Sequence, residues 1–93
     1  MPIILYTTSL ASSVKVTTEC RRMKDLLAAK QMKIKFTFEE VDVSTSIESK
    51  EQMQKTGKQI APVLVIDGKA YTFEEVSDLN EMEELDDLLR MAA

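Results

Sequence analysis

The chain has 93 residues, of which 44% are hydrophobic and 30% are charged, the size and composition of one globular domain. Its formal net charge is −4, so a nucleic-acid-binding face is not expected, and no apolar run is long enough to span a membrane. Histidine is absent and Cys20 is the only cysteine, which excludes Ser-His and Cys-His pairs, an internal disulfide and a multi-cysteine metal site.

The start of the chain predicts a strand followed by a helix. Residues 3–7, Ile-Ile-Leu-Tyr-Thr, form a short apolar run that is typical of a buried strand. A polar loop follows over residues 8–13, and Ser12 or Ser13 is predicted to cap a helix by accepting from its first free amides. The apolar face of that helix recurs at three- and four-residue steps, at Val16, Cys20, Met23 and Leu27.

The next segment predicts a second strand. Apolar residues alternate with polar ones over residues 34–38, and they alternate again at Val41 and Val43. The two patterns differ in phase by one residue. A bulge or break near residues 39–40 is therefore predicted if this segment is one strand.

A polar helix and a β-hairpin are predicted after the second strand. Residues 46–55 form a weakly periodic helix anchored by Ile47 and Met53, and Gly57 is a stop signal. Residues 63–72 then read Val-Leu-Val-Ile, Asp-Gly and Lys-Ala-Tyr-Thr. Because Asp-Gly favours a type I′ turn between two strands, this segment predicts a hairpin.

The tail over residues 73–91 predicts one bent helix or two short ones. Its apolar residues recur at helical spacing, at Val76, Leu79, Met82, Leu85 and Leu89. The carboxylates between residues 74 and 87 are expected on the solvated face opposite these side chains. The complete order, β-α-β-α-β-β-α(-α), predicts a single thioredoxin-like domain over residues 1–93, with a right-handed parallel crossover and a four-stranded mixed sheet flanked by helices.

The segment before the hairpin carries a family resemblance. Residues 60–63, Ile-Ala-Pro-Val, resemble the thioredoxin-like segment in which a cis-proline precedes the third strand, so a cis bond between Ala61 and Pro62 is expected. The strand at residues 5–9 looks like the one that leads into a glutaredoxin active site, which places the redox tetrapeptide on residues 11–14, where no thiol is present. The chain resembles the Src-homology-3-domain-binding glutamic-acid-rich-like family through Tyr6, Thr7, Thr8, Ser9, Val41, Asp42, Val43, Met53, Pro62 and Tyr71.

The chain also departs from the glutaredoxin pattern in ways that affect glutathione. Thr8 stands where glutaredoxins carry the lysine that meets the glycine carboxylate of glutathione. Thr72 and Phe73 replace the Gly-Gly pair that allows close backbone approach, although the acidic Glu74 and Glu75 remain. The resemblance therefore implies that glutathione binds at most weakly. No P-x-x-P segment is present for recognition by an Src-homology-3 domain.

Cys20 is expected to be structural rather than catalytic. It lies on the apolar helical face, about two turns from the helix start, where the helix dipole has little effect on a thiol. Arg21 and Arg22 are predicted on other faces, so neither is expected to stabilise a thiolate. Ser12 and Ser13 stand where a redox thiol would be, but the chain has no histidine to activate a hydroxyl.

Charge is distributed unevenly along the sequence. Residues 1–38 hold seven bases and two acids, a balance of +5, whereas residues 39–93 hold five bases and fourteen acids, a balance of −9. Such a chain could steer a charged partner or associate head to tail, or its basic first helix could neighbour its acidic last one. The amino terminus lacks the features of a signal peptide, so the cytoplasm, and also the nucleus, is the expected location. The chain is expected to be a monomer.

These observations favour a non-catalytic module that binds a protein partner and uses no metal or cofactor. The expected groove surrounds the Ala61–Pro62 bond, whose backbone would pair with an extended peptide. It comprises Thr8, Ser9, Ser12, Ser13, Ile60, Ala61, Pro62, Thr72, Phe73, Glu74 and Glu75. One alternative is a degenerate glutathione-dependent monothiol oxidoreductase that uses Cys20. Another is a structural subunit that buries the apolar side of its last helix against a larger assembly.

Overall fold

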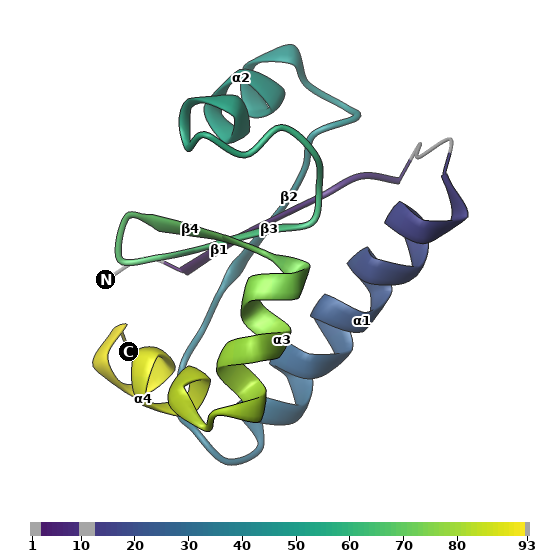
Figure 1. The fold of residues 1–93 in the computed structure, drawn as a ribbon. Helices are drawn as coiled ribbons and strands as arrows, with labels where there is room; N and C mark the ends of the chain where they lie inside the picture. The colour runs from purple at the N-terminus through teal and green to yellow at the C-terminus, as the bar shows by residue number, and fades with distance from the viewer. Residues whose placement is uncertain (1–2, 10–12, 93) are drawn as a thin grey trace.

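The computed structural model describes residues 3–9 and 13–92, which form a four-stranded sheet with helices on both faces (Figure 1). The elements in chain order are β1 (Ile3–Thr7), α1 (Val14–Gln31), β2 (Glu39–Asp42), α2 (Ile47–Lys55), β3 (Val63–Ile66), β4 (Lys69–Thr72), α3 (Phe73–Glu81) and α4 (Glu84–Ala92). The strand order is β2-β1-β3-β4, with β1 and β2 parallel and the other pairs antiparallel. This is the predicted thioredoxin-like arrangement.

The second strand is shorter than predicted and has no bulge. β2 begins at Glu39 and pairs with β1 one residue to one, while residues 34–38 before it have no regular structure. No bulge is needed to explain the shift in alternation. Both faces of the sheet are covered by helices, so apolar side chains can be buried on either side. Ile34 and Phe36 are buried in one core cluster, whereas Val43 is buried in the other.

The hairpin between β3 and β4 forms as predicted. Asp67 and Gly68 both have positive φ angles, 53° and 80°, as a type I′ turn requires. Ile66 and Lys69, on either side of the turn, form the last pair of the ladder. The local Asp-Gly signal therefore fixes the register of the hairpin.

The helix starts differ in part from the predictions. Ser13 occupies the N-cap position of α1, but its side chain makes no capping hydrogen bond, and Ser12 lies outside the described residues. In α2 the side chain of Ser46 does cap, accepting from the amide of Ser49. Ile47 is 79% exposed because it is the first residue of α2, which leaves Met53 as the one buried side chain of that helix.

The tail forms two short helices rather than one bent helix. The helices are separated at Met82 and Glu83, where Glu83 has a φ of 61°. Met82 was predicted on the apolar face but is 59% exposed, because it lies at the end of α3. The remaining residues predicted on the apolar face of the tail, Val76, Leu79, Leu85 and Leu89, belong to or pack against the core of the chain itself. The apolar side of α4 is therefore occupied, which argues against the structural-subunit alternative.

The core consists of two clusters on opposite faces of the sheet. Alternate strand residues contribute to each, and α1 and α3 lie side by side on one face while α2 lies on the other (Figure 1). The first cluster contains Ile3, Leu5, Met23, Leu27, Ile34, Phe36, Leu64, Ile66, Tyr71, Val76, Leu85, Leu89 and Ala92. The second contains Tyr6, Cys20, Val43, Met53, Ala61, Val63 and Val65.

One ion pair shows how the uneven charge of the sequence is used. Lys30 near the end of α1 lies 2.6 Å from the carboxylate of Asp86 in α4, and both side chains are largely buried. Lys30 lowers the pKa of Asp86, chiefly through the hydrogen bond between the two groups. The basic first helix thus neighbours the acidic last one. Over residues 3–9 and 13–92, no helix is both long and apolar enough to cross a membrane.

Candidate functional site

The site is built around the Ala61–Pro62 bond, which joins the loop after α2 to the start of β3. This peptide bond is cis, and both residues are buried, whereas Ile60 beside them is 69% exposed. Two pockets adjoin the bond, and both are lined by Ile60 and Ala61. No hydrogen bond among the described residues uses the backbone of Ala61, which lies beside the exposed Ile60.

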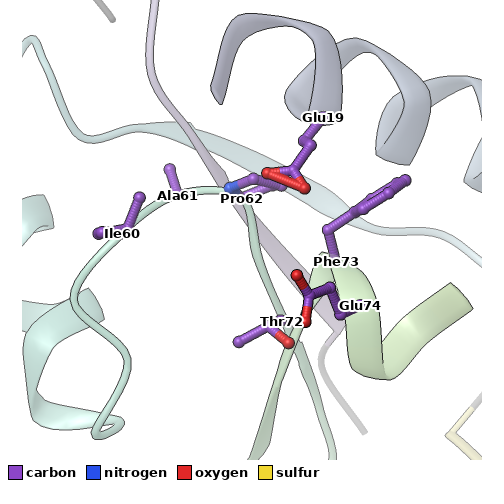
Figure 2. A pocket seen from close by; sticks show the side chains of 7 residues that line it. All are labelled: Glu19, Ile60, Ala61, Pro62, Thr72, Phe73 and Glu74. Atoms are coloured by element: carbon purple, nitrogen blue, oxygen red, sulfur yellow. The ribbon is translucent and has the colours of Figure 1, made fainter. Parts of the chain in front are cut away.

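The first pocket is acidic. It has a volume of about 220 Å³ and is lined by Glu19, Ile60, Ala61, Pro62, Thr72, Phe73 and Glu74. Figure 2 shows the carboxylate of Glu19 reaching from α1 to the vicinity of Pro62, with Glu74 approaching from the start of α3. The ring of Phe73 extends toward α1 and packs against the first core cluster (Figure 2). Two carboxylates and no cation therefore line this pocket.

Glu75 was predicted in the groove but has a structural role instead. The amide of Thr72 donates to its carboxylate at 3.1 Å, while the amide of Glu75 donates to the Thr72 hydroxyl at 3.2 Å, which forms a capping box at the start of α3. Lys58 lies 3.0 Å from the same carboxylate. The Thr72 amide and then Lys58 lower the pKa of Glu75, so its charge is engaged within the chain.

The second pocket combines an apolar floor with a single cation. Its volume is about 320 Å³, and its lining residues are Thr8, Ser13, Val16, Val43, Ser44, Lys50, Met53, Gln59, Ile60 and Ala61. Val43 and Met53 are buried core residues, whereas Lys50 is exposed and makes no ion pair with any described residue. No carboxylate lines this pocket. Its charge is therefore opposite to that of the first pocket.

Cys20 packs in the same core cluster as Ala61 but lines a third pocket, whose lining residues include neither Ala61 nor Pro62. This pocket of about 260 Å³ also includes Arg21, which was predicted on another face, and Lys24. The thiol is buried, with 5% of the residue exposed, and burial raises its pKa despite the opposing effects of the Thr8 backbone and Lys24. Lys24 pairs instead with the carboxylate of Glu40 at 2.8 Å. Cys20 is thus a protonated thiol outside the two central pockets.

A carboxylate network joins the loops that follow β1 and β2. Asp42 accepts from the amide of Ser44 at 2.9 Å and from the amide of Ser9 at 3.3 Å, and the two serine hydroxyls lie 3.0 Å apart. The Ser44 hydroxyl also donates to Asp42, and this hydrogen bond is the first of the effects that hold the pKa of Asp42 well below its usual range. Ser9 therefore anchors the loop and lines the third pocket, which it shares with one other predicted groove residue, Thr8.

The structure gathers most of the predicted groove residues but divides them between two pockets. Thr8 and Ser13 line the second pocket, and Pro62 and the start of α3 line the first. The sequence interpretation missed Glu19 and Lys50. Lys50 lies three residues before the buried Met53, so helical spacing could have placed it beside the pocket. In the described part of the chain, no group of three or more His, Cys, Asp or Glu residues could hold a metal.

Comparisons with known proteins agree on one fold. Residues 3–71 match the sequence model of the family described as Glutaredoxin, and no curated protein matches the chain. Buckwheat glutaredoxin in complex with glutathione is 16% identical, with a TM-score of 0.75 over 98% of this chain and 78% of that one. The glutaredoxin of Brucella melitensis is 25% identical, with a TM-score of 0.72 over 100% of this chain and 92% of that one. The C. albicans actin interacting protein Aip5 is 28% identical, with a TM-score of 0.62 over 97% of this chain and 89% of that one.

Proposed function

The chain belongs to the glutaredoxin family, and we propose that it is a non-catalytic member that binds an extended segment of a partner protein beside the Ala61–Pro62 bond. The observation that carries this proposal is the position of its only thiol. Cys20 is buried in α1 and lines the third pocket, whereas the two pockets at Ala61 have no cysteine. The family fold is kept, but its redox group is missing from the groove.

The state of Cys20 supports a role without thiol chemistry. A nucleophilic cysteine needs a thiolate that can reach its substrate. Burial raises the pKa of Cys20, and the nearby Lys24 is already paired with Glu40. Residues 11–14, where the resemblance places the redox tetrapeptide, read Ala-Ser-Ser-Val. No second thiol exists to resolve a mixed disulfide.

The free backbone of Ala61 supports binding of an extended peptide. Main-chain donors and acceptors at the end of a strand can pair with an added segment, while adjacent pockets select its side chains. Ala61 lies two residues before the start of β3 and lines two pockets of opposite charge. These features provide both elements of such recognition.

One comparison supports a protein partner, and another supports glutathione as a ligand. Aip5 shares this fold and is named as an actin interacting protein, which makes actin the first partner to test. We also propose that the chain belongs to the Src-homology-3-domain-binding glutamic-acid-rich-like branch, on the strength of the residues that resemble it, among them Tyr6, Met53 and Tyr71. Buckwheat glutaredoxin was solved with glutathione, and here Lys50 offers the cation that Thr8 cannot. Glutathione is therefore the second candidate ligand.

The proposal is tested with a pair of exposed apolar residues at opposite ends of the molecule. Ile60→Ser alters the shared wall of the two pockets, and Met91→Ser alters α4, where Met91 is 81% exposed. Proteins retained by the immobilised chain, with purified actin as the first, should be lost with Ile60→Ser and kept with Met91→Ser. Equal retention by both variants would contradict the proposed groove.

Catalysis is tested separately with a disulfide reductase assay that uses glutathione as the donor. The wild-type chain should show no turnover above background, because its one thiol is buried and protonated. Turnover that disappears in Cys20→Ser would instead establish the monothiol oxidoreductase alternative.

A further inference from the structure

The two pockets at Ala61 differ in charge in a way that orients a bound segment. Two carboxylates, Glu19 and Glu74, line the first pocket, and Lys50 is the one charged residue of the second. A negatively charged group is therefore repelled from the first pocket and attracted to the second. Since Ile60 and Ala61 line both pockets, one extended segment can cross from one to the other.

The second pocket presents an apolar floor and a cation to the same small volume. Val43 and Met53 are buried beneath it, while Lys50 and the amide of Gln59 stand at its polar side. The pocket has a volume of about 320 Å³, and a ligand group that combines an apolar side chain with a negative charge matches its lining.

We propose that the second pocket binds the C-terminal residue of a partner protein, with its apolar side chain on the floor and its α-carboxylate at Lys50. This inference rests on the proposed function, because it names the segment that occupies the groove. The residues before that terminus run past Ala61 toward the acidic pocket of Glu19 and Glu74.

Peptide geometry favours a terminal carboxylate over an internal Asp or Glu. Successive side chains of an extended segment point to opposite sides, so an internal acid and its apolar neighbour cannot enter the same pocket. In a C-terminal residue the carboxylate and the apolar side chain are attached to one Cα. Two internal side chains on the same side of an extended segment lie about 7 Å apart along it, whereas the C-terminal residue presents both groups from one position.

The same argument separates this ligand from glutathione. Glutathione ends in glycine, which offers a carboxylate to Lys50 but no side chain to the floor formed by Val43 and Met53. Buried apolar area contributes to affinity in proportion to its size. A terminal Val, Leu, Ile or Phe is therefore preferred over a terminal glycine.

The experiment uses the full chain and three fluorescent pools of hexapeptides. The first pool ends in Val, Leu, Ile or Phe with a free carboxylate, the second is the same pool amidated, and the third ends in glycine. Affinity is measured by anisotropy, and NMR shifts of Lys50, Gln59 and Ala61 report whether binding occurs at the groove. Lys50→Gln removes the cation, and Lys55→Gln, on the exposed side of the same helix, is the control.

Amidation should weaken binding about ten- to hundredfold, because one charge-assisted hydrogen bond is lost. Lys50→Gln should abolish the difference between the free and amidated pools, and Lys55→Gln should preserve it. Equal groove shifts with both pools would overturn the C-terminal inference while leaving the proposed protein-binding function in place. No saturable shift with any pool would also overturn it, and the Ile60→Ser retention experiment would then decide the proposed function independently.

Discussion

The two faces of the sheet are covered very differently. Three helices, α1, α3 and α4, close one face, and each contributes fully buried side chains such as Leu27, Val76 and Leu89. On the other face, α2 buries Met53 alone and leaves Ile47 exposed. The difference shows that this small domain concentrates its buried side chains on one face, whereas the second pocket lies on the thinly covered one, beside α2.

The largest expected effect is the loss of a core side chain on the heavily covered face. Leu89→Ala should lower the free energy of unfolding by about 2–5 kcal/mol, because a fully buried leucine leaves a cavity. Urea denaturation followed by circular dichroism measures this change, with Met91→Ala as the exposed control. Molecules that remain folded should bind peptides as the wild type does. A loss below about 1 kcal/mol would show that this face is less important than its burial indicates.

The thinly covered face should respond differently, because stability and binding meet at one residue. Met53→Ala should cost about 2 kcal/mol, at the lower end of the usual range, since α2 can move inward to fill the space. It should also weaken peptide binding, because Met53 forms part of the floor of the second pocket. Gln52→Ala, which changes an exposed residue of α2, is the control for helix propensity. Unchanged peptide affinity in Met53→Ala would break the proposed link between this face and the groove.

A smaller effect on stability is expected from Asp42, which joins the loops that follow β1 and β2. The pKa of Asp42 is lowered in the folded chain by its hydrogen bonds to Ser44 and Ser9. The carboxyl of Asp42 has a pKa of about 3.9 in the unfolded chain and a lower one in the folded chain. Its contribution to stability is therefore fully present above about pH 3.9 and is lost as the pH falls through the lower pKa of the folded state.

Asp42→Asn should consequently lower the free energy of unfolding by about 1 kcal/mol at pH 7. The variant should also lose less stability than the wild type when the pH is lowered from about 5 to 3. Thermal unfolding at several pH values measures both results. Parallel stability curves for the two proteins would contradict the role assigned to this carboxylate.

The weakest interaction expected is that with glutathione. Binding no tighter than the millimolar range is predicted even though Lys50 offers the cation that Thr8 lacks, because Glu75 is held by Thr72 and Lys58 and a terminal glycine leaves the apolar floor unfilled. NMR titration that follows Thr8, Ala61 and Glu74 measures the affinity. Saturation in the low micromolar range would show that both pockets accept glutathione fully.

The parts of the fold that depend on local sequence could be predicted. The Asp67–Gly68 turn fixes the hairpin register through its own backbone preference, and the apolar spacing of α1 identifies Met23 and Leu27 as core residues. The phase shift before Val43 predicted a bulge or a break, and the structure has a break at Glu39, because alternation alone does not distinguish the two. Ile47 was misread because a first helical residue can satisfy the periodicity and still face solvent.

The candidate site could be predicted only in part. Pro62 and its neighbours are marked by their own sequence, but Glu19 and Lys50 reach the pockets from helices distant in the chain. Their positions depend on how α1 and α2 pack on the sheet. Glu75 shows the opposite error, since an acid near the groove was available to cap a helix, and that local bond prevailed.

The carboxylate of Glu75 also links the two segments that border the first pocket. It holds Thr72, on one wall, and Lys58, in the segment that leads to Ile60 on the other wall. Both charged side chains are partly exposed, so dissolved salt screens their attraction. We therefore expect the attraction between Lys58 and Glu75, which holds the two walls of the pocket together, to weaken as ionic strength rises. Even an uncharged peptide should then bind with an affinity that depends on salt.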